Sequence, residues 1–237
     1  MTMIGNLKVG KIPRIVGTVH LKSELSKLPE LVEKQVVDIL ELRVDQLYQE
    51  GREVLTNSLV EMKEFQLPII ATIRKGEGYN FGEAERAEIF GKLIPHVDAI
   101  DIELGAEIRD EVIEAAKSHN KSVIVSEHNL IETPSDEEIE KSLSGLSSSG
   151  ADIIKIALFA NSSDDIARLM SLTLKHSREY PLVTISLGNL GTISRIIAPF
   201  FGSCLSYGYI EKPVIPGQSN LPSLNNALTK YFPNLHQ

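Results

Sequence analysis

The chain has a single cysteine, Cys204, no long apolar run, and fewer basic than acidic residues. One thiol cannot form an intrachain disulfide, which excludes a secreted scaffold held together by disulfides. No segment approaches the roughly 18 to 20 uninterrupted apolar residues that a membrane span requires, so we expect no membrane insertion. Asn6, Lys8 and Lys11 interrupt the N-terminal segment before an apolar stretch of signal-peptide length develops. These absences together predict a cytoplasmic protein.

The charge balance and the spacing of potential ligands exclude two further classes. The 24 Lys and Arg residues against 32 Asp and Glu give a formal net charge of −8, whereas a nucleic-acid-binding surface needs clustered basic residues. No H-x-x-x-H pattern and no pair of cysteines supplies a zinc site, so we expect no metal. The 237 residues, 42% of them hydrophobic, are enough for one large globular domain.

Apolar, β-branched runs alternate along the chain with longer amphipathic stretches. The runs cover residues 14–19, 36–44, 68–74, 99–104, 121–128, 152–160, 181–188 and 203–210. Continuous apolar strands are typical of a parallel sheet buried on both faces, and about eight β/α units without a linker favour a closed barrel. A doubly wound sheet is the alternative, but the first run lacks the G-x-G-x-x-G turn of a dinucleotide site. We therefore predict one α/β domain over residues 1–237, a (β/α)8 TIM barrel.

Charged residues stand at the ends of several predicted strands, where the active sites of such barrels lie. Glu41, Arg43 and Asp45 share parity in the second run, so we expect their side chains on one face. They fit either an ion-pair ladder that fills the barrel or a site for a polyhydroxylated ligand. Arg74 closes the third run and adds a cation to the same end.

Lys155 lies inside the apolar run 152–160, where an ammonium ion loses its hydration. Burying an unpaired charge there costs several kcal/mol. Desolvation and neighbouring cations such as Arg43 favour the neutral amine, which is the form that attacks a ketone. The alternative is a buried ion pair of Lys155 with Glu41 or Glu103. Asp101 shares parity with Glu103, and both fit partners of nearby arginines at least as well as catalysts.

His128 ends the fifth run, a place where a lone histidine is more often a structural hydrogen-bonding group than a catalyst. The other five histidines are scattered without convergent partners, which favours His128 as an acid or base.

The segment GNLGTISR ends at Arg195, and PVIPGQSN contains Gln218. Both segments follow the last two runs, where many barrels bind an anionic group. Because a guanidinium can hold a carboxylate with two parallel hydrogen bonds, Arg195 suits a carboxylate.

The motifs ELRVD, TIR, SEHN, IIKIA, G-x-x-G-x-x-SR followed by FGS, and PGQ together resemble the type I 3-dehydroquinate dehydratase family, in that family's order and over nearly the whole chain. The resemblance implies that Lys155 forms an imine with the ketone of 3-dehydroquinate. His128 would take the adjacent proton and then protonate the departing hydroxyl, and Glu77 would orient His128. The implied product is 3-dehydroshikimate, on the shikimate route to aromatic amino acids. The family implies no cofactor, and by analogy we expect a homodimer.

The resemblance also assigns the residues that contact the substrate. They are Thr18, Glu41, Arg43, Arg74, Arg195 and Gln218, with Arg195 on the carboxylate, Gln218 closing over it, and Glu41, Arg43 and Arg74 on the ring hydroxyls. Two positions depart from the family's pattern. Val214 stands where many members have serine or threonine, and Asn189 replaces the lysine that is usual after the glycine of the seventh strand.

Two rival functions fit parts of the same residue set. A lysine-imine aldolase also needs a strand lysine, but sugar-phosphate substrates favour a nest of loop amides over a strand-end arginine. A non-catalytic barrel would keep Lys155 and His128 only as structural remnants. Trapping of substrate mass on Lys155 by borohydride would separate an imine-forming enzyme from a binding protein.

Overall fold

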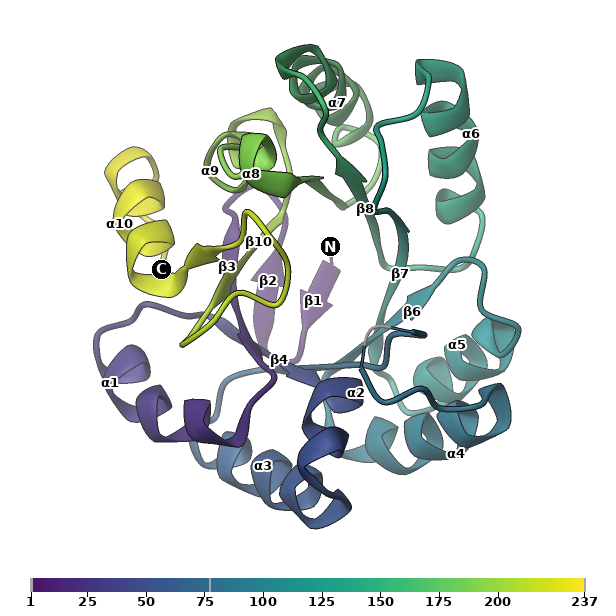
Figure 1. Cartoon of the computed structure of the whole chain (residues 1–237), viewed down its shortest axis with the longest axis vertical. Coiled ribbons are helices and arrows are strands. Elements are labelled where there is room, and N and C mark those ends of the chain that lie inside the picture. The colour runs from purple at the N-terminus through teal and green to yellow at the C-terminus, as the bar shows by residue number, and fades with distance from the viewer. Residues whose placement is uncertain (1, 77, 237) are drawn as a thin grey trace.

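The computed structural model describes residues 2–76 and 78–236 and shows a ring of parallel strands surrounded by helices (Figure 1). The eight strands of the ring are β3 (Arg14–Val19), β4 (Ile39–Arg43), β5 (Ile69–Thr72), β6 (Ala99–Glu103), β7 (Ser122–Asn129), β8 (Ile153–Phe159), β9 (Leu182–Leu187) and β10 (Leu205–Tyr209). Each predicted run overlaps one of these strands, and neighbours in the chain pair in parallel from β3 through β9. The predicted (β/α)8 barrel is confirmed.

The ring closes between its first and last strands. β10 pairs with β3 in parallel, and on its other side the backbone N–H of Cys204 donates to Leu182 O at 2.8 Å. The N–H of Thr184 donates to Ser203 Oγ at 3.1 Å and adds a second link between β9 and the start of β10. A two-residue strand, β11 (Ser219–Asn220), extends the sheet beside β10. Closure brings the carboxyl ends of all eight strands to one mouth.

Helices cover the outside of the ring, where the amphipathic stretches were expected (Figure 1). They are α1 (Leu28–Glu33), α2 (Val44–Leu47), α3 (Arg52–Glu64), α4 (Glu83–Leu93), α5 (Arg109–Ser118), α6 (Asp136–Ser147), α7 (Ser163–His176), α8 (Gly188–Gly191), α9 (Ser194–Ile197) and α10 (Leu221–Tyr231). Ser135 and Ser162 cap α6 and α7 by accepting from the N–H groups of Glu138 and Asp165. Both caps satisfy N–H groups that the first helical turn leaves unpaired.

The hairpin of β1 (Thr2–Ile4) and β2 (Leu7–Val9) covers the amino-terminal end of the barrel, behind the ring in Figure 1. Sequence reasoning did not foresee it. Ile4 and Val9 are buried and pack with apolar residues that point into the barrel, such as Val16 and Ile39. A second apolar layer lies between the outer face of the sheet and the helices. The barrel is thus closed at one end, and a site can open only at the other.

Aspartates at the amino-terminal end link neighbouring strands in a repeated pattern. Asp38, Asp98 and Asp152 directly precede β4, β6 and β8, and each accepts from a backbone N–H of the preceding ring strand. The three N···O distances are 2.8, 2.9 and 2.8 Å. Each aspartate also donates its own N–H back to the same strand. These reciprocal bonds fix the register of three strand pairs and so align the side chains at the opposite end.

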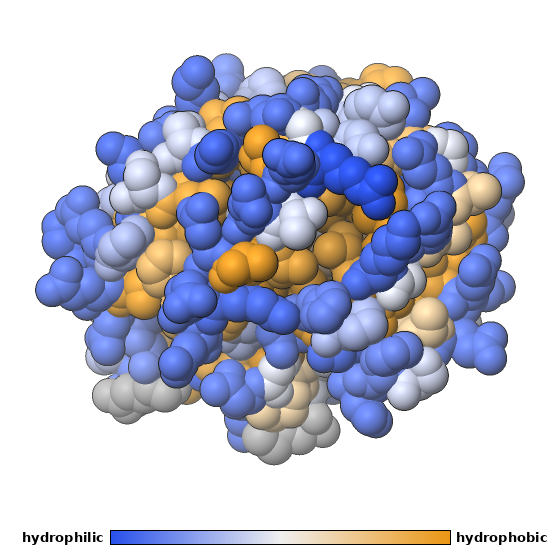
Figure 2. All heavy atoms as spheres, turned by 90° about the horizontal axis from the view of Figure 1, so that it is seen from below, coloured by the Kyte–Doolittle hydropathy of each residue, from blue (hydrophilic) through white to orange (hydrophobic). Residues whose placement is uncertain are grey.

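The outer surface is polar over most of the side that carries α3, with apolar residues visible in the grooves between charged side chains (Figure 2). This distribution is the ordinary one for helices that pack one apolar stripe against a sheet. Within the described ranges, no helix has both the length and the apolar character that would let it cross a membrane.

Candidate active site

A cavity opens at the carboxyl end of the barrel, where charged residues of β4 and β8 meet Arg74, which follows β5, and Arg195 of α9. Its lining comprises Thr18, Glu41, Arg43, Arg74, His128, Leu130, Lys155, Ala157, Ile185, Leu187, Arg195, Tyr207, Val214, Ile215 and Gln218. Eight of the nine predicted site residues are among them. The ninth, Glu77, lies outside the described residues. The structure therefore brings together residues that are up to 200 positions apart in the chain, such as Thr18 and Gln218.

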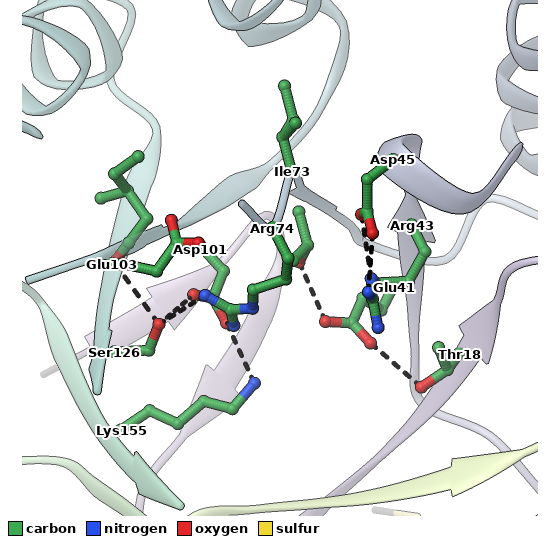
Figure 3. A network of polar contacts seen from close by, with 12 residues as sticks. Thr18, Glu41, Arg43, Asp45, Ile73, Arg74, Asp101, Glu103, Ser126 and Lys155 are labelled. Carbon is green, nitrogen blue, oxygen red and sulfur yellow. Dashed lines mark hydrogen bonds and ion pairs between the residues drawn. The ribbon is translucent and has the colours of Figure 1, made fainter. Parts of the chain in front are cut away.

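Lys155 projects from β8 into the barrel and is 5% exposed. Its Nζ donates to Asp101 Oδ2 at 3.0 Å (Figure 3) and lies 4.1 Å from the ring centroid of Tyr207. The expected alternative partners, Glu41 and Glu103, do not hold it: Glu103 is paired with Arg86 instead. The ion pair of Lys155 is therefore real, but its partner was misassigned.

Asp101 connects the cations of the site and is fully buried on β6. Its Oδ2 accepts from Arg74 at 2.7 Å as well as from Lys155, and its Oδ1 accepts from the Ser126 hydroxyl at 2.6 Å (Figure 3). Burial by itself would raise the pKa of Asp101, but Arg74 and then Lys155 outweigh it and hold that pKa well below its usual range. Asp101 is therefore an anion at neutral pH.

Glu41 lies next to two hydroxyl groups, one on each neighbouring strand. Thr18 Oγ1 donates to Glu41 Oε2 at 3.0 Å (Figure 3), and Thr72 Oγ1 donates to Oε1 at 2.9 Å. Because Glu41 is only 5% exposed and lines the cavity, these bonds fix a carboxylate at its wall. Such a carboxylate accepts hydrogen bonds from ligand hydroxyls.

Arg43 and Asp45 do not follow the predicted pattern of side chains on one strand face. β4 ends at Arg43, and Asp45 belongs to the short helix α2. The change of backbone lets the Arg43 Nε and Nη2 donate to Asp45 at 3.1 and 2.8 Å. The prediction that Asp45 shares a strand face with Glu41 and Arg43 was wrong, because β4 ends before Asp45. The predicted ion pair nevertheless forms and orients the Arg43 guanidinium at the cavity.

His128 lies near the end of β7 and is partly exposed to the cavity. It has no hydrogen-bond partner within residues 2–76 and 78–236, so a purely structural bonding role has no support there. Burial, followed by the positive charges of Arg74 and Lys155, holds the pKa of His128 well below 6.5. The imidazole is consequently neutral at physiological pH and able to accept a proton.

Arg195 brings a buried cation to the cavity from α9. The side chain is 3% exposed, and its Nε and Nη1 have no hydrogen-bond partner in the described part of the chain. Burial lowers the pKa of Arg195 to about 10, so the guanidinium remains charged at neutral pH. An unpaired buried guanidinium is costly unless a ligand supplies the missing acceptors. A planar anion such as a carboxylate fits that need.

The G-x-x-G-x-x-SR motif explains how Arg195 is placed. A Cβ on Gly191 would lie 2.3 Å from Ser186 O, so only glycine permits the turn to pack against β9. The Ser194 hydroxyl accepts from the N–H of Ser186 at 2.9 Å, and Arg195 O accepts from the Ser206 hydroxyl of β10 at 2.7 Å. These contacts fix the backbone of Arg195 between β9 and β10.

The PGQ loop covers the cavity from the side of β10. Gly217 has a φ of +81°, and a Cβ there would lie 2.1 Å from Gly188 O, so the loop packs against the turn after β9. Gln218 Oε1 accepts from the N–H of Val214 at 2.9 Å, and its Nε2 donates to Thr18 Oγ1 at 3.4 Å. Val214, one of the two departures from the family pattern, thus supports Gln218 through its backbone.

Comparison with known proteins finds one matching family. The family model described as type I 3-dehydroquinase matches residues 15–234. A 3-dehydroquinate dehydratase of Methanocella arvoryzae is 38% identical over 221 residues, which is 91% of this chain and 95% of the relative. One from Hydrogenobaculum sp. is 40% identical over 82% of this chain and 88% of the relative.

Solved structures agree with this result. The type I 3-dehydroquinate dehydratase of Clostridium difficile, solved with covalently modified comenic acid, superposes with a TM-score of 0.86 at 28% identity and covers 97% of this chain and 96% of that chain. The 3-dehydroquinate dehydratase from Aquifex aeolicus gives a TM-score of 0.80 at 32% identity, over 92% and 99% of the two chains.

Proposed function

This chain belongs to the type I 3-dehydroquinase family, and we propose that Lys155 is the nucleophile with which it forms the Schiff base of its reaction. The enzyme is a hydro-lyase of the shikimate pathway that removes water from 3-dehydroquinate to give 3-dehydroshikimate. The observation that carries the assignment of Lys155 is its buried position in a cavity that also contains Arg195, a cation without a hydrogen-bond partner for its Nε and Nη1 among the described residues. One group supplies the amine for the ketone, and the other supplies a charge complement for the substrate carboxylate.

Lys155 activates the substrate by replacing its ketone oxygen with nitrogen. Once Nζ has released its proton, it attacks the carbonyl carbon, and loss of water leaves a protonated imine. The iminium withdraws electrons from the adjacent C–H bond, which becomes a much stronger acid. The C–H electron pair forms a C=C bond while the C=N pair moves to nitrogen. Return of that pair expels the hydroxyl group, and hydrolysis of the product imine restores Lys155.

His128 is the proposed acid and base. Because its pKa lies well below 6.5, the resting imidazole is neutral and can take the proton from carbon. The imidazolium that results can then protonate the departing hydroxyl, so that water leaves as a neutral molecule. Glu77 stays the proposed partner of His128, on the strength of the family resemblance alone.

The remaining polar groups are proposed to bind and orient the substrate. Glu41, Arg43 and Arg74 face the ring hydroxyls, and Arg195 holds the carboxylate through Nε and Nη1, which have no partner in the part of the chain that the structure describes. Gln218 and Thr18 are bonded to each other at the edge of the cavity, and we assign them to the closing wall over the ligand. Substitutions that alter these contacts should change the substrate affinity more than the rate of bond breaking.

The family resemblance supports three further proposals about the whole chain. We propose that residues 1–237 act as one catalytic domain, that the enzyme works in the cytoplasm, and that it pairs as a homodimer. Light scattering of the purified protein tests the last of these, since a dimer has twice the 26.2 kDa mass of the chain.

An ultraviolet assay for the conjugated enone product tests the proposed nucleophile. Wild-type enzyme and Lys155→Ala receive 3-dehydroquinate, and parallel samples are reduced with borohydride and examined by peptide mass spectrometry. We expect product and an adduct on Lys155 from the wild type, and neither from a folded Lys155→Ala. Substantial turnover by that variant would refute the imine at Lys155.

A further inference from the structure

The Nζ of Lys155 lies between two groups that the family motifs leave unassigned. Asp101 Oδ2 is 3.0 Å away on one side, and the ring centroid of Tyr207 is 4.1 Å away on another. Asp101 is 0% and Tyr207 4% exposed, so little water weakens either contact. A carboxylate and an aromatic face both favour a cation over a neutral nitrogen. The surroundings of Nζ are therefore built for positive charge.

We propose that Asp101, together with the ring of Tyr207, is a positioning residue that acts through Lys155 and keeps its Schiff base protonated. This inference rests on the proposed function of Lys155. The protonated imine withdraws electrons strongly, because its cationic nitrogen becomes neutral when it accepts the C=N electron pair. The neutral imine withdraws electrons only weakly. An imine is also a weaker base than an amine, so its proton needs a neighbouring anion more than the proton of the resting ammonium does.

The other carboxylates near the cavity have different partners. Glu41 accepts from two threonine hydroxyls, Asp45 holds both Nε and Nη2 of Arg43, and Glu103 accepts from Arg86. Among the described residues, Asp101 is the carboxylate in contact with Nζ. The iminium N–H retains one proton to donate, and Asp101 is the acceptor already beside it.

Asp101 is also held in a fixed orientation and its charge is moderated. Ser126 fixes Oδ1, while Arg74 and Lys155 share Oδ2. Sharing with Arg74 weakens the pull on Lys155, which matters because the ammonium must lose a proton before it can attack. The arrangement therefore suits a nitrogen that is deprotonated once and cationic for the steps that follow.

Tyr207 supplies the second wall through its ring. Its hydroxyl is buried and lacks a hydrogen-bond partner within the described residues, and burial, then the carboxylates of Glu41 and Asp101, raises the pKa of Tyr207 well above 10. The hydroxyl is therefore neutral at working pH. The expected contribution of Tyr207 is the face of its ring over Nζ, which Tyr207→Phe retains and Tyr207→Leu removes.

The test measures trapping of the imine as a function of pH. Wild-type enzyme, Asp101→Asn and the control Asp38→Asn are mixed with 3-dehydroquinate and sodium cyanoborohydride, which reduces protonated imines, between pH 6 and 9. Asp38 is another buried carboxylate, but it lies at the closed end of the barrel and bonds the N–H of Ile15. The adduct on Lys155 is quantified by mass spectrometry, and kcat and KM are measured alongside.

We expect Asp101→Asn to move the alkaline limit of trapping and of kcat down by about 1 to 3 pH units, the usual effect of an opposite charge at this range. Near pH 8 trapping should fall at least about 10-fold, with KM changed far less, and it should recover toward pH 6. Arg74, Lys155 and His128 act electrostatically on Asp101, and Asp101 acts on Tyr207. Arg43 acts on His128 and Glu41 on Tyr207. Loss of Asp101 also lowers the pKa of His128, but this moves the acidic limb of kcat and not the alkaline limit of trapping.

Variants of Tyr207 and Ser126 test the other contacts around Lys155 and Asp101. Tyr207→Phe should keep the wild-type profile, and Tyr207→Leu should shift it in the same direction as Asp101→Asn. If Asp101→Asn does not fold, Ser126→Ala takes its place as the test. It removes the hydroxyl that holds Asp101 Oδ1 and should shift the pH profile by a smaller amount than the loss of the carboxylate would. A folded Asp101→Asn, or failing that a folded Ser126→Ala, with the wild-type pH profile would overturn the inference and leave Lys155 as the nucleophile. Absence of an adduct on wild-type Lys155 would instead overturn the proposed function.

Discussion

Arg195 should bind the substrate carboxylate and at the same time lower the stability of the folded state. The structure gives the size of both effects. Burial lowers its pKa to about 10, which corresponds to about 3 kcal/mol of stability lost by keeping the guanidinium charged at neutral pH. Arg195→Met retains an unbranched chain in the same space without the charge. We therefore expect the free energy of unfolding to rise by about 1 to 3 kcal/mol, or the melting temperature by about 2 to 10 °C for a chain of this size.

The same substitution should impair catalysis severely. Each charge-assisted hydrogen bond to a carboxylate contributes about 1.5 to 3 kcal/mol, so loss of two lowers kcat/KM by about 10² to 10⁴-fold. Differential scanning calorimetry and the enone assay measure the two effects on one preparation, and Ile185→Met, at an uncharged position in the cavity wall, serves as the control. A variant that melts below the wild type and retains its kcat/KM would contradict both roles of Arg195.

Two further predictions concern protonation and loop packing. In the folded state the pKa of His128 lies below 6.5, so below pH 6.5 the unfolded chain takes up a proton that the folded chain does not. The free energy of unfolding therefore falls as the pH drops below 6.5. His128→Gln should remove up to about 2 kcal/mol of the loss between pH 6.5 and 5, as urea titrations at both pH values would show. Gly217→Ala places a Cβ against Gly188 O and should lower kcat/KM by about 10 to 100-fold through displacement of the PGQ loop. Gly150→Ala, with a similar φ of +86° and Ile113 nearby at 3.8 Å, is the control for an alanine at positive φ outside the loop and should leave kcat/KM unchanged.

The fold could be predicted from the sequence because every strand of the ring is buried on both faces. Such strands appear as mostly apolar runs, and the intervening helices have one apolar stripe, so the two kinds of element can be told apart locally. The hairpin of β1 and β2 escaped prediction because its strands are three residues each. Segments this short carry no measurable period, and their burial depends on the barrel that they cover.

The site could be predicted only where a residue conflicts with its local surroundings. Lys155 in an isoleucine-rich strand and His128 at a strand end are such conflicts, and the cavity contains both. Asp101 looked like one more strand-end acid, since nothing in the chain near residue 101 indicates the approach of Lys155. Tyr207 was not singled out, because an aromatic residue within an apolar strand is typical of a core. Partners from different strands become neighbours only after ring closure, which the sequence predicts in outline but not in register.

The two ends of the barrel separate stability from chemistry, and a pair of carboxylates can test this. Asp98 accepts the N–H of Ile69 at the closed end, so Asp98→Ala should leave that donor unpaired and cost about 1 to 2 kcal/mol of stability, with kcat/KM within about twofold of the wild type. Glu41→Gln, at the open end, keeps its shape but loses the charge that accepts ligand hydroxyls, so kcat/KM should fall about 10 to 100-fold. Thermal melts and enone assays on both proteins give the four values. Equal losses of activity in the two variants would mean that strand register at the closed end sets the geometry of the cavity more tightly than its own side chains do.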